Sequence, residues 1–222
     1  MEVGILKVIA VSDIHGDARA RRFLTEVISK HSPDLLIICG DITTFGPASF
    51  AEQLLKNLGA KCAVIPGNCD PEDVLDVIEK HSISLHEKRV EIDGIDFVGM
   101  GGSPICTMRT PREMDEEYIE KVLSDIMVEN CVLVTHAPPY GINDLTRSGK
   151  RLGSRAVERI VRKFHPRIVL SGHVHEAKGI TEDNGMIFAN PGPLKEGNIV
   201  LMDIDHEVSA KIVDLSDILR KL

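Results

Sequence analysis

The chain has 222 residues, of which 43% are hydrophobic, and it carries a formal net charge of −8 at pH 7. This length and apolar content predict one domain, residues 1–222, with a substantial core. The negative charge argues against duplex nucleic acid as a partner, because a duplex-binding face carries a basic excess. No apolar run approaches the roughly 20 residues that span a bilayer, and residues 1–4 show no signal-peptide pattern, so we expect a cytoplasmic protein with no membrane partner.

The first part of the chain predicts consecutive strand, helix and strand units. Apolar runs and helical spacing alternate, with strands expected at 5–11, 35–39 and 62–65 and helices at 18–30, 47–58 and 71–80. The last of these helices is expected to begin with Asp70 as its N-cap and Pro71 in its first turn. Units of this kind predict a parallel sheet.

The second part of the chain mixes hairpins with further helices. Asp93-Gly94 lies between two apolar segments, which is a strong β-hairpin signal. Helices are expected at 115–127 and 154–164, strands at 131–134 and 167–170, and a β-rich tail from 179 to 213. The pattern predicts an α/β fold, a four-layer α-β-β-α sandwich of two mixed sheets flanked by helices.

Side chains that bind metals stand at or just after five of the predicted strand ends. They are Asp13, His15, Asp41, Asn68, His136, His173 and His175. Because the carboxyl ends of parallel strands meet at one edge of a sheet, we expect these groups to converge. Spacing alone suggests that Asp13 and His15 both face one ion, and that His173 and His175 likewise both face a single ion. Such a set suits two divalent cations about 3.5–4 Å apart.

The order of these segments resembles the calcineurin-like metallophosphoesterase family. The matching pieces are Asp-Ile-His at 13–15, Gly-Asp at 40–41, Gly-Asn-Cys-Asp at 67–70, His136, and Gly-His-Val-His at 172–175. The resemblance implies that Asp13, His15 and His175 bind a first ion, that Asp41 bridges, and that Asn68, His136 and His173 bind a second. Manganese is the first expectation, with Fe, Zn, Ni, Co and Mg as alternatives.

The resemblance also implies an activity. Cys69 stands where most members of the family carry a histidine thought to protonate the leaving group or bind the substrate. The resemblance to small prokaryotic members with Gly-Asn-Cys-Asp implies phosphodiesterase activity. We expect a metal-bridging hydroxide to attack the phosphorus of a small phosphoester, such as a nucleotide, with Asp41, Asn68, Cys69 and His136 as catalytic residues. Diesters are favoured, with monoesters as further substrates. The alternative is a noncatalytic metal-binding or protein-interaction scaffold on the same fold.

Basic residues gather in two loops of this acidic chain. Arg109 and Arg112 lie in one loop, and the other contains Arg147, Lys150, Arg151 and Arg155. Such clusters suit a phosphate-bearing substrate, so Arg147 is an expected substrate contact. Ser154 is either a second such contact, at a helix N-terminus, or only an N-cap. No role is expected for His31, His81, His86, His165 and His206.

Overall fold

The computed structural model describes residues 4–107 and 109–222. Residues 1–3, on which the expectation of no signal peptide partly depends, and residue 108 lie outside the described residues. The helices are α1 (Ala20–His31), α2 (Ala48–Leu55), α3 (Glu72–His81), α4 (Glu116–Ile126), α5 (Arg155–Phe164) and α6 (Ser216–Arg220), with 3-10 turns η1 (His175–Ala177) and η2 (Leu194–Glu196). The strands are β1 (Leu6–Val11), β2 (Leu35–Ile38), β3 (Cys62–Val64), β4 (Ile83–Ser84), β5 (Lys88–Ile92), β6 (Ile95–Met100), β7 (Ser103–Pro104), β8 (Glu113–Met114), β9 (Val132–Thr135), β10 (Ile168–Leu170), β11 (Gly179–Asp183), β12 (Met186–Asn190), β13 (Asn198–Ile204) and β14 (Val208–Asp214).

Two six-stranded sheets form the centre of the molecule. The first has the order β14-β13-β1-β2-β3-β4, in which β1 to β4 run parallel and β13 lies antiparallel to β1. The second has the order β11-β12-β10-β9-β6-β5, with a parallel centre and antiparallel strands at both edges. Both sheets are therefore mixed, and the apolar runs of β1, β2, β9 and β10 are buried on both faces, as parallel strands under helices require.

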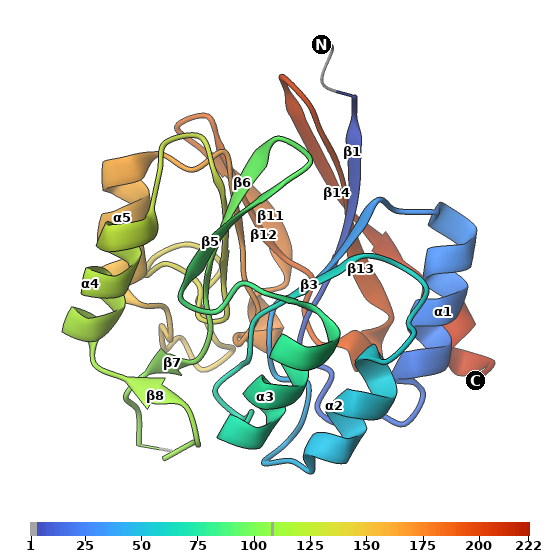
Figure 1. The fold of residues 1–222 in the computed structure, drawn as a ribbon. Helices are drawn as coiled ribbons and strands as arrows, with labels where there is room; N and C mark the ends of the chain where they lie inside the picture. The colour runs from blue at the N-terminus through green and yellow to red at the C-terminus, as the bar shows by residue number, and fades with distance from the viewer. Residues whose placement is uncertain (1–3, 108) are drawn as a thin grey trace.

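Three apolar layers hold the four structural layers together. Residues such as Phe23 of α1 and Val74 of α3 pack against the outer face of the first sheet. Residues such as Val8 and Phe97 fill the space between the sheets. Leu123 of α4 and its neighbours cover the outer face of the second sheet. Figure 1 shows α1, α2 and α3 on one side and α4 and α5 on the other, and this confirms the predicted sandwich.

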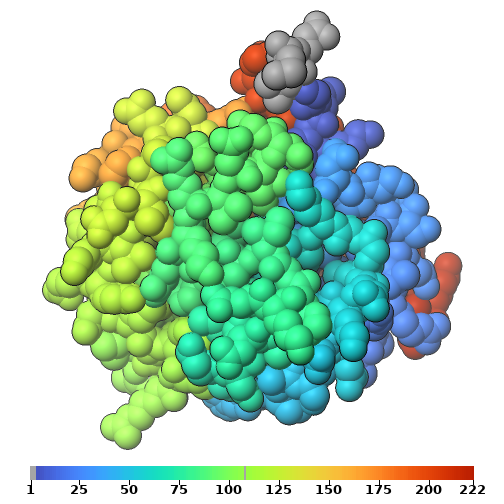
Figure 2. Space-filling view, in the orientation of Figure 1, coloured from blue at the N-terminus to red at the C-terminus, as the bar shows by residue number. Residues whose placement is uncertain are grey.

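The path of the chain explains how the two sheets are joined. In the space-filling view, the segment from α3 to β6 lies across the middle of the visible face, between the earlier and the later elements (Figure 2). The Asp93-Gly94 turn joins β5 to β6, and both residues have positive φ (51° and 79°), as a tight hairpin requires. None of the described helices could cross a membrane.

The structure corrects one local expectation and adds short elements. Helix α3 begins at Glu72 with Pro71 as its N-cap, and no side chain caps it. Asp70 therefore does not cap this helix, because its carboxylate turns inward to other partners described below. The two-residue strands β4, β7 and β8 and the short helix α6 had no periodic signal, since fewer than six residues carry too little pattern.

Candidate functional site

The predicted ligands meet at the carboxyl ends of five parallel strands from both sheets. Asp13 and His15 follow β1, and Asp41 follows β2. Asn68, His136 and the two histidines of the Gly-His-Val-His segment follow β3, β9 and β10 respectively. Short backbone hydrogen bonds join these loops, such as those from Asp13 N–H to the carbonyl of Gly40 (3.1 Å) and from Gly172 N–H to that of His136 (3.0 Å). The two sheets thus contribute to one site.

One half of the site consists of Asp13, His15 and His175. The Nε2 atoms of the two histidines are 3.2 Å apart, and Asp13 Oδ1 is 3.3 Å from His175 Nε2. These three side chains offer ligand atoms that all lie within 4.8 Å of one another. Two imidazole nitrogens and a carboxylate aimed at one point form a donor set that fits a divalent cation.

The other half consists of Asn68, His136 and His173. Both imidazoles point at the same amide oxygen, since Asn68 Oδ1 is 2.9 Å from His136 Nε2 and 2.8 Å from His173 Nδ1. His173 and His175 therefore belong to different halves, and the expectation from spacing that both face one ion is wrong. The reason is local: His173 has φ 65°, so the backbone turns between the two residues and their side chains diverge.

Asp41 lies between the halves and faces both of them. Its Oδ2 is 3.5 Å from His15 Nε2, and its Oδ1 is 3.4 Å from His136 Nε2. The residue is 3% exposed and has φ 50°. A carboxylate in this position has one oxygen for each half, which is the geometry that a bridging ligand needs.

The outer contacts of two imidazoles leave their inner nitrogens free for a metal. His136 Nδ1 lies 2.8 Å from the carbonyl of Cys39, a contact in which Nδ1–H donates and which leaves Nε2 as the ring nitrogen that faces Asn68. His15 Nδ1 is 3.1 Å from Thr44 Oγ1. Contacts of this kind fix the tautomer and ring orientation of metal-bound histidines. The Thr44 contact was not expected from the sequence.

Two glycines allow the loops to approach each other this closely. A Cβ atom on Gly67 would lie 1.9 Å from Asp41 Oδ1, and one on Gly172 would lie 1.8 Å from Ser12 Oγ and 2.6 Å from Asp13 Oδ2. Any side chain at these positions would displace a ligand or its neighbour. The glycines before Asn68 and His173 are therefore a requirement of packing.

Burial and neighbouring charges shift the pKa values of the carboxylate and imidazoles in the site. Burial opposes the charge of Asp41, but the charges of His136 and His15 and the N–H of Cys69 outweigh it and hold the pKa of Asp41 below its usual value. Burial lowers the pKa of His173 to about 4, and it also lowers the pKa of His15. For His136 burial acts in the same direction, but Asp41 outweighs it and raises the pKa to about 9. The shared carboxylate is thus ionised and ready to bind a cation.

Asp70 connects the loop of Asp41 to the loop of Asn68. Its buried carboxylate accepts hydrogen bonds from the N–H groups of Ile42 (3.0 Å), Thr43 (2.8 Å) and Gly67 (2.8 Å), and from Thr43 Oγ1 (2.9 Å). The three bonds from Ile42 and Thr43 join the segment after β2 to the segment after β3, and the bond from Gly67 lies within the latter. Sequence reasoning missed this role because the partners of Asp70 in the first loop lie 27 and 28 positions away.

Comparisons with known proteins agree with this arrangement. The calcineurin-like phosphoesterase family matches residues 6–177, which include all seven expected ligands. The chain belongs to this family. It is 33% identical over 202 residues to protein MJ1162 of Methanocaldococcus jannaschii, covering 86% of this chain and 90% of the relative.

Two further proteins extend the comparison. A Synechococcus protein, described as a probable cyclic nucleotide phosphodiesterase, is 25% identical over 155 residues, or 68% of this chain and 61% of its own. The crystal structure of TT1561 from Thermus thermophilus matches with a TM-score of 0.69 at 19% identity, covering 94% of this chain and 99% of that one. The structural match supports the fold of this family member.

Cys69 borders the ligands of this calcineurin-like site. Its N–H donates to Asp41 Oδ1 (2.8 Å), and its Sγ accepts from Asn68 Nδ2 (3.5 Å). The Sγ atom and the nearest ligand atoms of His15 and Asp41 lie within 4.8 Å of one another. Burial and the carboxylate of Asp41 raise the pKa of the thiol, so the half-buried sulfur keeps its proton. The side chain is thus a neutral group beside the expected metal ligands.

Three of the six basic residues in the two loops are occupied by other partners. Arg112 pairs with Glu72 (2.9 Å), Arg151 pairs with Asp144, and the guanidinium of Arg155 lies 3.7 Å from the centre of the Tyr140 ring. Arg109 and Lys150 are exposed. Arg147 differs because it lines a cavity whose wall includes His175.

Ser154 is the N-cap of α5. It is fully buried, its Oγ accepts from the N–H of Val157 (3.1 Å), and it donates to Glu116 Oε2 (2.7 Å). Glu116 also accepts from the N–H groups of Arg155 (2.9 Å) and Ala156 (2.7 Å). The N-terminus of α5 therefore binds an anion that the chain itself supplies, and the geometry favours the capping role of Ser154 over substrate contact.

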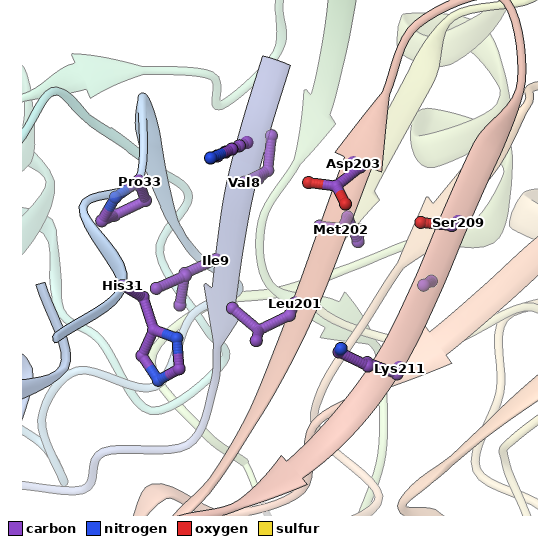
Figure 3. A pocket seen from close by; sticks show the side chains of 11 residues that line it. Val8, Ile9, His31, Pro33, Leu201, Met202, Asp203, Ser209 and Lys211 are labelled. Carbon is purple, nitrogen blue, oxygen red and sulfur yellow. The ribbon is translucent and has the colours of Figure 1, made fainter. Parts of the chain in front are cut away.

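A separate groove lies near the amino end of β1. Figure 3 shows side chains of β1, β13, β14 and the end of α1 with the segment after it, among them Ile9, His31, Leu201 and Lys211. None of the seven expected ligands lines it. The groove is thus separate from the expected metal ligands, which collect at the opposite end of the strand.

Proposed function

We propose that this family member is a phosphodiesterase that uses two divalent cations. The single observation that carries the proposal is the position of Asp41, whose two oxygens lie 3.5 Å and 3.4 Å from an imidazole of either half. Asp13, His15 and His175 would hold one ion, Asn68, His136 and His173 would hold the other, and Asp41 would bind both. Manganese is the first candidate, and Fe, Zn, Ni, Co and Mg are the others.

The bound cations would stabilise the charge on the phosphoryl oxygens and activate water for attack on phosphorus. The chain supplies the arrangement around them. Asp41 holds the two halves in register, and the Cys39 carbonyl orients His136 with Nε2 toward Asn68. Cys69 stands at the position of the family's leaving-group acid, and its thiol is the proton donor that we propose for the departing alkoxide.

The substrate class follows from the family and from the cationic surroundings. The Synechococcus relative is described as a probable cyclic nucleotide phosphodiesterase, which supports a small phosphodiester, including a nucleotide, as the substrate of this chain. We propose Arg147 as the substrate contact, because it is the basic loop residue that lines a cavity with His175.

The test combines metal analysis with hydrolysis of bis(4-nitrophenyl) phosphate in the presence of Mn, Ni, Co, Zn or Mg. We expect two ions per chain and metal-dependent release of nitrophenol. Asp41→Asn and His136→Ala should abolish the activity, whereas the exposed residues Asp125 and His206 provide the matched controls Asp125→Asn and His206→Ala. Full activity in Asp41→Asn, or one ion per chain at saturation, would refute the dinuclear assignment. Inertness with all five metals would favour the noncatalytic scaffold.

A further inference from the structure

An open cavity of about 450 Å³ adjoins the first half of the metal-ligand set. Arg147 lines it from the loop before α5, His175 and Lys178 line it from the region of η1, and Lys195 lines it from η2. Because His175 is one of its walls, a molecule bound at the metal ligands on this side could extend directly into the cavity.

Positive charge prevails in this cavity although the protein is acidic. Its walls carry Arg147, Lys178 and Lys195 against Glu176 and Glu196. Lys178 Nζ bonds Glu196 Oε2 at 2.9 Å, so these two charges offset each other. In the described part of the chain, no carboxylate lies within ion-pair distance of Arg147 or Lys195. The positively charged side chains of Arg147 and Lys195 are therefore available to an external anion.

The turn that carries Pro193, one of the residues that line the cavity, is held in place by packing and backbone contacts. Gly192 has φ +74°, and a Cβ there would lie 3.0–3.2 Å from three carbons of the Lys178 side chain, so the aliphatic stem of the lysine rests on this turn. The turn is tied to the ligand segment, because Leu194 N–H donates to the carbonyls of Ser12 (3.0 Å) and Asp13 (3.2 Å). The cationic wall and the metal ligands thus belong to one connected unit.

Arg147 also sits on an ordered loop. Thr146 N–H donates to the carbonyl of Lys150 (2.9 Å), Gly149 N–H donates to that of Thr146 (2.9 Å), and Leu145 pairs with Arg151. A guanidinium on such a loop loses less conformational entropy when it binds a phosphate. Its planar set of N–H donors also matches the geometry of two phosphate oxygens.

We propose that this cavity is a second anion subsite, which binds a non-reacting phosphate of the substrate while the scissile phosphodiester lies at the metal ligands. This inference rests on the proposed function and narrows it: the preferred substrate is a diester that carries another phosphate group. A diester whose remaining part is uncharged would leave Arg147 and Lys195 unpaired and would bind less tightly.

The experiment compares matched ligands on the metal-loaded protein. Calorimetry measures the affinities of thymidine 3′,5′-bisphosphate and thymidine 5′-monophosphate, and kinetics compares the 5′-(4-nitrophenyl phosphate) ester of thymidine with and without a 3′-phosphate. Because the cationic groups are largely exposed, we expect a preference of about five- to tenfold for the second phosphate, seen in the dissociation constant and in KM more than in kcat. The preference should shrink as salt is added.

Two variants and one control decide the assignment. Arg147→Ala and Lys195→Ala should each reduce the preference severalfold, whereas Arg22→Ala, which removes one exposed positive charge on α1, should keep it. Equal affinity of the wild-type protein for both ligands, or a preference that survives both substitutions, would overturn the subsite. If neither ester is hydrolysed, the proposed function fails, but the calorimetric comparison still decides whether the cavity binds the second phosphate.

Discussion

His86 makes the stability of the protein depend on pH in a way that can be isolated by one substitution. The side chain is 8% exposed, and its Nδ1 accepts a hydrogen bond from the N–H of Gly101 at 3.1 Å. The carbonyl of the preceding residue, Met100, accepts from the N–H of His136. His86 thus supports the segment that holds a metal-ligand loop, and it can do so only while Nδ1 is unprotonated.

The magnitude follows from the pKa of His86 in the folded and unfolded chain. Burial, and then the positive charges of Arg112 and Lys88, lower the pKa from 6.5 to about 4, although Glu79 acts in the opposite direction and Glu87 lies 3.6 Å from Nε2. As pH falls below 6.5, the unfolded chain takes up the proton first, so the free energy of unfolding decreases until pH reaches the folded pKa. The loss is about 2 kcal/mol at pH 5 and about 3 kcal/mol in total.

Urea unfolding of the wild-type protein and of His86→Asn at pH 7.5, 6 and 5 measures this effect. Asparagine places an oxygen near the position of Nδ1, so it can accept from Gly101 without titrating. Other groups titrate in both proteins, and the difference between the two profiles therefore isolates His86. We expect the wild type to lose about 2 kcal/mol more than the variant between pH 7.5 and pH 5. Parallel profiles would refute the reasoning.

Three further outcomes are expected. Gly172→Ala should weaken the free energy of metal binding, measured by calorimetry, by about 1–3 kcal/mol, because its Cβ would displace Asp13. In the control Gly179→Ala, the Cβ would meet no atom closer than 4.0 Å, so this variant should bind metal normally. Cys69→His should raise the rate on esters of poorly acidic alcohols, since general acid catalysis contributes roughly 10²–10⁴-fold, and an unchanged or lower rate would count against the thiol as a weak acid. Glu116→Ala should lower the free energy of unfolding by roughly 1–3 kcal/mol, because three hydrogen bonds at the start of α5 are lost. The control is Glu117→Ala, which removes an exposed carboxylate. Equal stability of the two variants would contradict the capping role.

The convergence of the seven expected ligands could be predicted because each follows a buried strand. Apolar runs such as 5–11 and 131–134 identify parallel strands, and parallel strands place their carboxyl ends at one edge. The four-layer fold follows from the same alternation of strands and helices, with a hairpin at Asp93-Gly94 as the start of the second sheet's edge. Local pattern was sufficient here because each signal spans several residues and repeats along the chain.

The supporting contacts could not be predicted, because each joins residues far apart in the sequence. Asp70 before Pro71 has the pattern of a helix cap, yet its partners Ile42 and Thr43 are 28 and 27 residues away. Glu116 reaches the N-terminus of α5 across about 40 positions. Nothing near either carboxylate in the sequence indicates these partners, since local pattern encodes the element and tertiary packing selects what the polar group at its end will bind.

The backbone of the site explains why such distant contacts are needed. Four of the seven expected ligands, Asp13, His15, Asp41 and His173, have positive φ between 49° and 65°. Each such conformation costs about 1 kcal/mol or more, so together they consume a substantial part of the 5–15 kcal/mol that typically stabilises a domain. Hydrogen bonds from the neighbouring loop to the Asp70 carboxylate, and from Leu194 N–H to the carbonyls of Ser12 and Asp13, offset this strain by holding the loops in place. Because the strained conformations direct His173 and His175 to different halves, the backbone that costs stability is also what divides the ligands into two groups around one shared carboxylate.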